Sequence, residues 1–152
     1  MTAPLALVTG GVKRVGAAIA ARLADSGYAL ALHGNSDAIP EDQLAERLEK
    51  TACDWSGFQQ DFTVDGAAET LIDQVVGHFG RTPDLIVNSA SIFGQDDADS
   101  IGEQDLQAHF RVNSLVPILL TTALYQRRPA GSDRACVIHI LDQRIRNPNR
   151  DQ

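Results

Sequence analysis

The chain has 152 residues, about the size of one ordinary domain, with no room for a second full core. Its apolar share of 43% and charged share of 22% are typical of a soluble globular protein. The net charge of −7 and the pI of about 4.9 argue against nucleic-acid binding, because nucleic-acid binders usually present a basic face. No apolar stretch is long enough for a membrane span, and no basic region precedes the apolar N-terminal run, as it would in a signal peptide. The two cysteines have no metal-ligand spacing, so we expect a cytoplasmic protein with free thiols and no bound metal.

The predicted elements alternate between strands and helices. Leu5–Thr9 is a short apolar run that ends at two glycines, which is typical of a buried strand. Val15–Ala24 has apolar residues at helical spacing, and Ser26-Gly27 ends it. The later elements are a strand over Tyr28–His33, a helix over Asp42–Lys50, a weak strand over Gly57–Gln60, a helix over Val64–Phe79, a strand over Asp84–Asn88, a long helix over Glu103–Arg127 and a strand over Ala135–Leu141.

This alternation predicts a three-layer α/β fold. Short, nearly continuous apolar strands indicate a parallel sheet that helices cover on both faces. Right-handed crossovers then favour a Rossmann-type doubly wound sheet with strand order 3-2-1-4-5. In such a sheet a ligand binds at the carboxyl ends of the strands, near the point where the strand order reverses. We expect residues 1–152 to form one such NAD(P)-binding domain.

The segment TGGVKRVG, Thr9 to Gly16, joins the first strand to the first helix, which is the context of a phosphate-binding loop. Gly10 and Gly11 have no side chain that would keep the backbone away from a pyrophosphate, and Gly16 lets the helix lie close to the sheet. The helix N-terminus attracts anions, and Lys13 and Arg14 add full positive charge. Arg14 is therefore a candidate phosphate ligand, or a guanidinium that reaches over the cofactor to the substrate. The alternative is a tight turn with two solvent-facing basic residues.

The second strand ends in HGNS, His33 to Ser36, with no acid at the strand end. An NAD-preferring dinucleotide fold usually has a carboxylate there for the ribose 2′-OH. His33, Asn35 and Ser36 are neutral donors that would tolerate a 2′-phosphate, so the sequence favours NADP(H) over NAD(H). The alternative is that they are ordinary polar loop residues.

Taken together, these segments resemble the short-chain dehydrogenase/reductase family, and within it the pteridine-reductase-like branch, across all 152 residues. That branch carries TGxxxRxG in place of TGxxxGxG, which accounts for Arg14. VNSAS, Val87 to Ser91, is similar to the family's NNAG-type segment, with Ser89 in place of the second asparagine and Ser91 in place of the glycine. Asn113 in RVNSLVP matches the family's helix asparagine, and Asp142 in HILDQ stands where this branch has aspartate.

The resemblance implies an oxidoreductase that transfers hydride from NADPH to a small carbonyl or imine substrate, with a pterin as a candidate substrate. It implies that Asn113 and Asp142 assist catalysis and that Arg14, Ser91 and Phe93 contact the substrate, with Phe93 stacking on a pterin. The cofactor-binding residues would be Gly10, Arg14, Val15, Gly16, His33, Asn35, Ser36, Asp61, Phe62, Asn88, Ser89 and Ala90.

Several of these residues also have a plain structural interpretation. Asp61 is a possible helix N-cap, Asn113 a possible solvated helix residue, Phe93 a possible packing residue and Asp142 a possible loop acid. The histidine of the last strand, His139, is expected in the core or at the sheet edge.

The family's catalytic Tyr-x-x-x-Lys pair is not in these residues. Tyr28 is followed by ALAL and Tyr125 by QRRP, and the only lysines are Lys13 and Lys50. The resemblance places the pair, and further strands, beyond Gln152, so we expect a piece of a longer reductase that is inactive alone. The alternatives are a non-catalytic NADP(H)-binding module and an inert remnant. The family typically forms tetramers, so we expect self-association.

Overall fold

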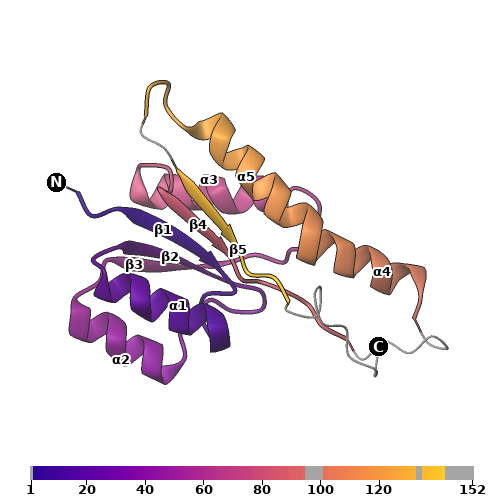
Figure 1. Ribbon diagram of the computed structural model, residues 1–152, viewed down its shortest axis with the longest axis horizontal. Coiled ribbons are helices and arrows are strands. Elements are labelled where there is room, and N and C mark those ends of the chain that lie inside the picture. The colour runs from indigo at the N-terminus through magenta and orange to yellow at the C-terminus, as the bar shows by residue number, and fades with distance from the viewer. Residues whose placement is uncertain (1, 95–100, 133–134, 143–152) are drawn as a thin grey trace.

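A computed structural model gives the structure of the chain and describes residues 2–94, 101–132 and 135–142. Its centre is a parallel sheet of five strands in the order β3-β2-β1-β4-β5 (Figure 1), so the predicted topology is confirmed. The strands are β1 (Leu5–Thr9), β2 (Ala29–Gly34), β3 (Trp55–Gln59), β4 (Leu85–Asn88) and β5 (Cys136–His139).

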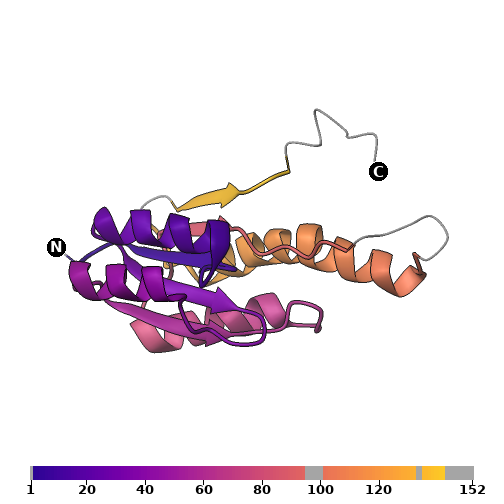
Figure 2. The same cartoon turned by 90° about the horizontal axis from the view of Figure 1, so that it is seen from below.

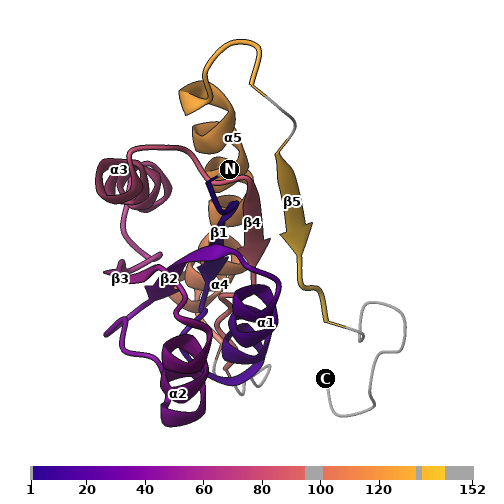
Figure 3. The same ribbon diagram turned by 90° about the vertical axis from the view of Figure 1, so that its left-hand side faces the viewer.

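Helices cover both faces of the sheet. The helical elements are α1 (Arg14–Asp25), α2 (Asp42–Thr51), α3 (Ala67–Phe79), α4 (Glu103–Phe110), the π-helical segment η1 (Arg111–Leu115) and α5 (Val116–Arg127). Figure 3 shows α1 and α2 on one face and α3 and α5 on the other. Figure 2 shows α4 and α5 in line, with α4 reaching past the carboxyl ends of the strands. Among the described residues, none of these helices is both long and apolar enough to cross a membrane.

The apolar strands supply two separate cores because successive side chains of a strand point to opposite faces. In β1, Leu5 and Leu7 pack with α3 and α5, whereas Ala6 and Val8 pack with α1 and α2. All four side chains are fully buried. This two-sided burial explains why the central strands read as continuous apolar runs in the sequence.

Most predicted boundaries agree with the structure to within one residue, and the larger differences are in β3, α3, the long helix and β5, which ends at His139 rather than at Leu141. β3 begins at Trp55, two positions before the predicted Gly57, and α3 begins at Ala67 after the N-cap Gly66 rather than at Val64. The predicted long helix covers the same span, but η1 interrupts it. Pro117 has no N–H, so it cannot donate to the carbonyl of Asn113, and the Val116 N–H instead bonds to the Arg111 carbonyl five residues back.

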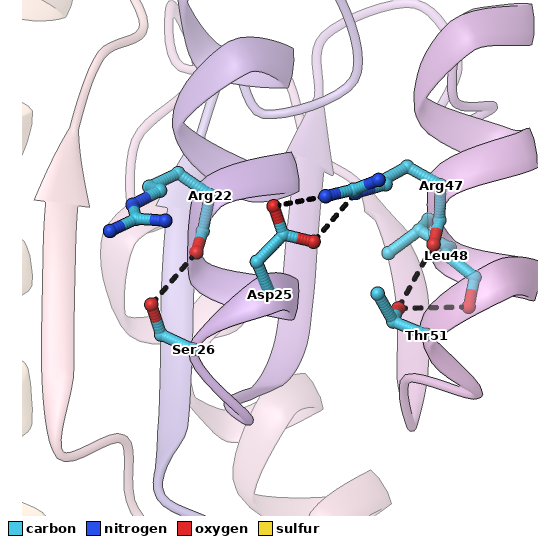
Figure 4. Close-up of polar contacts among 6 residues, drawn as sticks. All are labelled: Arg22, Asp25, Ser26, Arg47, Leu48 and Thr51. Carbon is cyan, nitrogen blue, oxygen red and sulfur yellow. Dashed lines mark hydrogen bonds and ion pairs between the residues drawn. The ribbon is translucent and has the colours of Figure 1, made fainter.

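Helices α1 and α2 are joined at the surface by an ion pair (Figure 4). The guanidinium of Arg47 donates two hydrogen bonds of 2.6 Å to the carboxylate of Asp25, and this contact lowers the pKa of that carboxyl. The hydroxyls of Ser26 and Thr51 donate to backbone carbonyls of their own helices, at Arg22 and Arg47. The helix α1, which follows the glycine loop, is thus joined to α2, which follows β2.

Candidate functional site

A cleft of about 950 Å³ lies at the carboxyl ends of the strands. It is lined by the glycine loop, the end of β2, the loop after β4, η1 and the residues that follow β5. Every residue that the sequence analysis assigned to the site lines this cleft, except Asp61: Gly10, Arg14, Val15, Gly16, His33, Asn35, Ser36, Phe62, Asn88, Ser89, Ala90, Ser91, Phe93, Asn113 and Asp142.

Two glycines of the loop are required by the geometry. Gly10 has a φ of 61°, and a Cβ there would lie 3.0 Å from the Cα of Ala90. A Cβ on Gly16 would lie 2.0 Å from the carbonyl oxygen of Gly10, which no side chain allows. The missing side chains therefore let the loop, the helix α1 and the segment after β4 come together at one point.

Arg14 occupies a backbone conformation that favours glycine. Its φ is 55°, in the left-handed region, which costs a non-glycine residue about 1 kcal/mol. Its side chain is exposed and lines the cleft, and its N–H donates to the carboxylate of Glu41 over 3.2 Å. Glycine, which the more common form of this loop has at this position, adopts such a φ without strain, whereas Arg14 does not.

His33 has a different environment from the one expected. It is 2% exposed, its Nδ1 lies 3.1 Å from the Gly10 nitrogen, and its Nε2 lies 2.8 Å from the Gln60 carbonyl oxygen. Burial lowers its pKa to about 4. Both ring nitrogens already have partners in the protein, so the sequence-based reason for His33, a free donor to a 2′-phosphate, does not match its contacts.

The last two residues of the HGNS segment, Asn35 and Ser36, are exposed and line the cleft. Asp37 lines it too, but its Oδ1 accepts the N–H of Ile39 over 3.3 Å and so turns toward its own loop. The basic residues Lys13 and Arg14 lie on the same part of the cleft wall. This end of the cleft therefore combines two cationic side chains with neutral donors.

The segment after β4 is fixed by the last residue of β1. The hydroxyl oxygen of Thr9, a residue 1% exposed, accepts the N–H groups of Ser89 and Ala90, both over 3.0 Å. Sequence reasoning did not assign Thr9 to the site; its place directly before the glycine loop was the available signal. These bonds hold the cleft wall in place from a fully buried side chain.

Asn88 and His139 form the floor of the cleft between β4 and β5. Their side-chain nitrogens, Nδ2 and Nδ1, lie 3.3 Å apart, and both residues line the cleft. His139 is exposed on β5, at the edge of the described sheet. Of the two positions expected from the sequence, the core and the sheet edge, it has the second. Asn88 is 5% exposed, and among the described residues nothing hydrogen-bonds to its Oδ1. A buried carbonyl oxygen of this kind is an available acceptor for a ligand donor.

Asn113 is bound to the same wall through η1. Its side-chain amide accepts the N–H of Ile92 and donates to the carbonyl of Ile92, both over 2.9 Å. The side chain of Asn113 thus positions the backbone at Ile92. The backbone carbonyl of Asn113 lacks the donor that an α-helix supplies four residues later, because position 117 is a proline. Pro117 was the sequence signal for this irregularity.

The substrate candidates Ser91 and Phe93 line the cleft from the loop after β4, and Asp142 lines it from the segment after β5. Phe93 is 67% exposed in the loop after β4, and Ser91 and Asp142 are exposed as well. Asp61 lies outside the cleft lining, and its Oδ1 accepts both the N–H and the hydroxyl of Thr63 over 2.8 Å, which lowers the pKa of the Asp61 carboxyl. It therefore caps a turn before α3, which begins six residues later at Ala67.

The cleft fits an elongated phosphate-bearing ligand. The N-cap Lys13 makes no capping hydrogen bond, and Glu41 takes only the Arg14 N–H, so the amides of Val15 and Gly16 in the first turn of α1 are available to an anion. The close approach at Gly10 and Gly16 and the unpaired oxygen of Asn88 lie along the same wall. A cleft of this size accommodates a dinucleotide, since small-molecule pockets span roughly 300 to 1,000 Å³.

Neither tyrosine contributes to the cleft lining. Tyr125 is 81% exposed on α5, and Tyr28 packs at the other end of β2 beside Cys53. Among the described residues, no group of three or more histidine, cysteine or acidic side chains could hold a metal ion. The chemistry of the described residues is therefore that of hydrogen bonding and charge at the cleft wall.

The chain belongs to the short chain dehydrogenase family, whose sequence model matches residues 4–140. It is 27% identical to hydroxynaphthalene reductase arp2 of Aspergillus fumigatus over 132 residues, or 86% of this chain and 48% of that protein. It is 31% identical to the (3R)-3-hydroxyacyl-CoA dehydrogenase of Rattus norvegicus over 143 residues, or 90% of this chain and 55% of that protein. The chain thus spans about half the length of these curated relatives.

Solved structures agree with this fold. The alternative dihydrofolate reductase 1 (FolM) of Brucella canis, complexed with NADP, superposes with a TM-score of 0.81 at 29% identity, over 96% of this chain and 58% of that chain. The NADH-dependent reductase A1-R′, responsible for alginate metabolism, superposes with a TM-score of 0.84 at 20% identity, over 97% of this chain and 62% of that chain. At the lower identity the likeness concerns the fold alone.

Proposed function

We propose that this chain is the NADP(H)-binding part of a reductase that reduces a small carbonyl or imine substrate, with pterins as the substrate class. The observation that carries the proposal is the convergence of the glycine loop, the β2 end, Asn113 and Asp142 on one cleft. When bound, the nicotinamide supplies the hydride. The amides of Val15 and Gly16 and the charge of Arg14 would hold its pyrophosphate, and Asn88 would accept a hydrogen bond from it.

The preference for NADP(H) is supported by charge at the β2 end. Lys13 and Arg14 face this part of the cleft, where Asn35 and Ser36 offer neutral donors. Two carboxylates lie nearby, and both accept backbone N–H groups: Asp37 that of Ile39 and Glu41 that of Arg14. The FolM structure from Brucella canis, 29% identical, is a complex with NADP.

The pterin proposal is supported by three residues that line the cleft. Phe93 offers an exposed ring for stacking, Asp142 a carboxylate for an amino-substituted ring, and Arg14 a guanidinium. Dihydrofolate, the substrate in the name of the FolM neighbour, contains a pterin ring. Asn113 would position the loop that carries Phe93, through its two hydrogen bonds to Ile92.

A second candidate is a binding module without turnover, which the absence of Tyr-x-x-x-Lys from these 152 residues favours for the chain alone. Cofactor binding, which both candidates require, is tested by mixing the 152-residue chain with NADPH and dihydropterin and following both cofactor fluorescence and absorbance at the nicotinamide band. Binding without oxidation of NADPH is expected here. The intact mass of the native protein then decides between them: a mass well above 16.4 kDa with a Tyr-x-x-x-Lys peptide favours the reductase, and its absence favours the module.

Cytoplasmic location and assembly into a tetramer stay predictions from the sequence and its resemblance.

A further inference from the structure

The buried ring of His33 lies between the glycine loop and the end of β3. It is the next-to-last residue of β2, is 2% exposed, and stacks on Phe62 with ring centroids 4.0 Å apart and planes inclined by 10°. Phe62 is itself 3% exposed. A polar ring in this position must satisfy its nitrogens inside the protein, because water does not reach them.

The two hydrogen-bond partners select one neutral form of the ring. The backbone N–H of Gly10 can only donate, so Nδ1, 3.1 Å away, must be the unprotonated acceptor. The carbonyl of Gln60 can only accept, so Nε2, 2.8 Å away, must carry the hydrogen. Desolvation by burial lowers the pKa to about 4, which keeps this neutral form at neutral pH.

His33 accepts hydrogen bonds from the amides of both glycines after β1, Gly10 and Gly11. Gly10 donates to the ring and Gly11 donates over 2.9 Å to the backbone carbonyl of His33. Gly10 is in the left-handed region, and Gly16 lies directly against its carbonyl oxygen. The position of Gly10 therefore decides where the first turn of α1 begins.

We propose that His33 is a positioning residue for anion binding: through Nδ1 its neutral ring holds Gly10 so that the free amides of Val15 and Gly16 face the cleft. The ring does not itself bind a phosphate. This inference rests on the proposed NADP(H) function, and it gives the β2 histidine a different role from that of Asn35 and Ser36, whose side chains are exposed.

Two substitutions separate the two contacts of the ring. In His33→Asn, the side-chain oxygen reaches about the position of Nδ1 and can accept the Gly10 N–H, while the bond to Gln60 is lost. In His33→Gln, the longer amide reaches about the position of Nε2 and can donate to Gln60, while the bond from Gly10 is lost. Each variant loses one hydrogen bond, so a purely structural role predicts similar effects for both.

The experiment measures the NADPH dissociation constant, the thermal midpoint and the exchange rate of the Gly10 amide in the full 152-residue chain and both variants. We expect His33→Asn to bind within about threefold of the wild type and His33→Gln to bind about tenfold more weakly, the range expected for one lost hydrogen bond. Gly10 exchange should be slow in the wild type and in His33→Asn and fast in His33→Gln. Equal losses of affinity in both variants, or unchanged affinity in His33→Gln, would overturn the inference.

The result also separates this inference from the proposed function. If the wild type binds neither NADPH nor NADH, the proposed function fails, while Gly10 exchange still decides whether His33 holds the loop. If a variant does not fold, the nitrogen chemical shifts of His33 in the wild type decide: a ring protonated only on Nε2 supports the inference, and one protonated on Nδ1 overturns it.

Discussion

Arg14 combines a strained backbone with an exposed cationic side chain. Glycine would adopt the left-handed φ of 55° with less strain than arginine does. Strain of this kind persists where a side chain is used, and the side chain of Arg14 lines the cleft. At this position glycine would favour stability, whereas arginine favours ligand binding.

Replacing Arg14 should therefore separate stability from binding. Arg14→Gly relieves the strain and Arg14→Ala retains it, while both remove the guanidinium. We expect Arg14→Gly to be more stable than Arg14→Ala by about 1 kcal/mol, and both to bind NADPH about tenfold more weakly, as for a lost charge-assisted bond. Urea unfolding and fluorescence titration measure the two effects. Wild-type affinity in both variants would remove Arg14 from the cofactor site.

His33 should make stability depend on pH in a defined window. Its pKa is about 4 in the folded chain and about 6.5 when unfolded, so between these values the unfolded state binds more protons. Stability should be complete above pH 6.5 and fall by about 3 kcal/mol as the pH drops to about 4. Urea unfolding at several pH values measures the slope, and His33→Asn serves as the control. The same slope in the control would show that another group titrates.

At the scale of elements, the long helix is built around one irregular turn. Pro117 removes an α-helical hydrogen bond, η1 forms, and Asn113 within η1 holds both backbone groups of Ile92. Two ion pairs, Arg111–Asp65 and Arg127–Asp73, fix the helix to α3 and the segment before it. The loop that carries Ser91 and Phe93 is therefore positioned by a helix more than twenty residues further along the chain.

Substitution of Asn113 tests this link. Asn113→Ala removes both hydrogen bonds to Ile92 and should lower the unfolding free energy by about 1–2 kcal/mol and speed up exchange of the Ile92 amide. Asn113→Asp keeps the acceptor for that amide, so its exchange should stay slow. Hydrogen exchange followed by NMR reads both variants. Slow exchange at Ile92 in Asn113→Ala would mean that the loop is held by other contacts.

The elements could be predicted from the sequence, whereas the finer geometry of the site could not. The alternation of short apolar strands with helices, together with right-handed crossovers, was sufficient for the topology. The partners of His33 were not predictable, because Gly10 and Gln60 reach it only through the folded sheet, 23 and 27 residues away. The left-handed φ of Arg14 had a signal, since the position is usually glycine, but the sequence alone suggested only its charge.

At the scale of the whole molecule, the long helix and β5 are two of the surfaces on which large apolar side chains remain exposed. On the long helix these are Leu106, Phe110, Ile118 and Tyr125, and beside the cleft Ile138, Ile140 and Leu141 on and after β5. β5 pairs only with β4 among the described strands, so its other edge offers backbone groups to a partner. Both surfaces fit the self-association expected from the family resemblance.

Two matched substitutions distinguish these surfaces. Phe110 is 62% exposed and Ile138 is 43% exposed, and neither lines the cleft. We expect Phe110→Lys to shift the 152-residue chain toward monomer in sedimentation velocity and Ile138→Lys to have the smaller effect, because the long helix presents more exposed apolar surface. NADPH affinity should stay unchanged in both. A shift in Ile138→Lys alone would assign the association to the β5 edge.

The most direct test is a titration of the 152-residue chain with NADPH and with NADH, followed by calorimetry. If these residues form a cofactor cleft whose β2 end carries Lys13 and Arg14, NADPH should bind and should bind about tenfold or more tightly than NADH, as expected for a 2′-phosphate met by charged donors. Binding of neither nucleotide, or tighter binding of NADH, would contradict the cofactor site built from Arg14, Asn35 and Ser36.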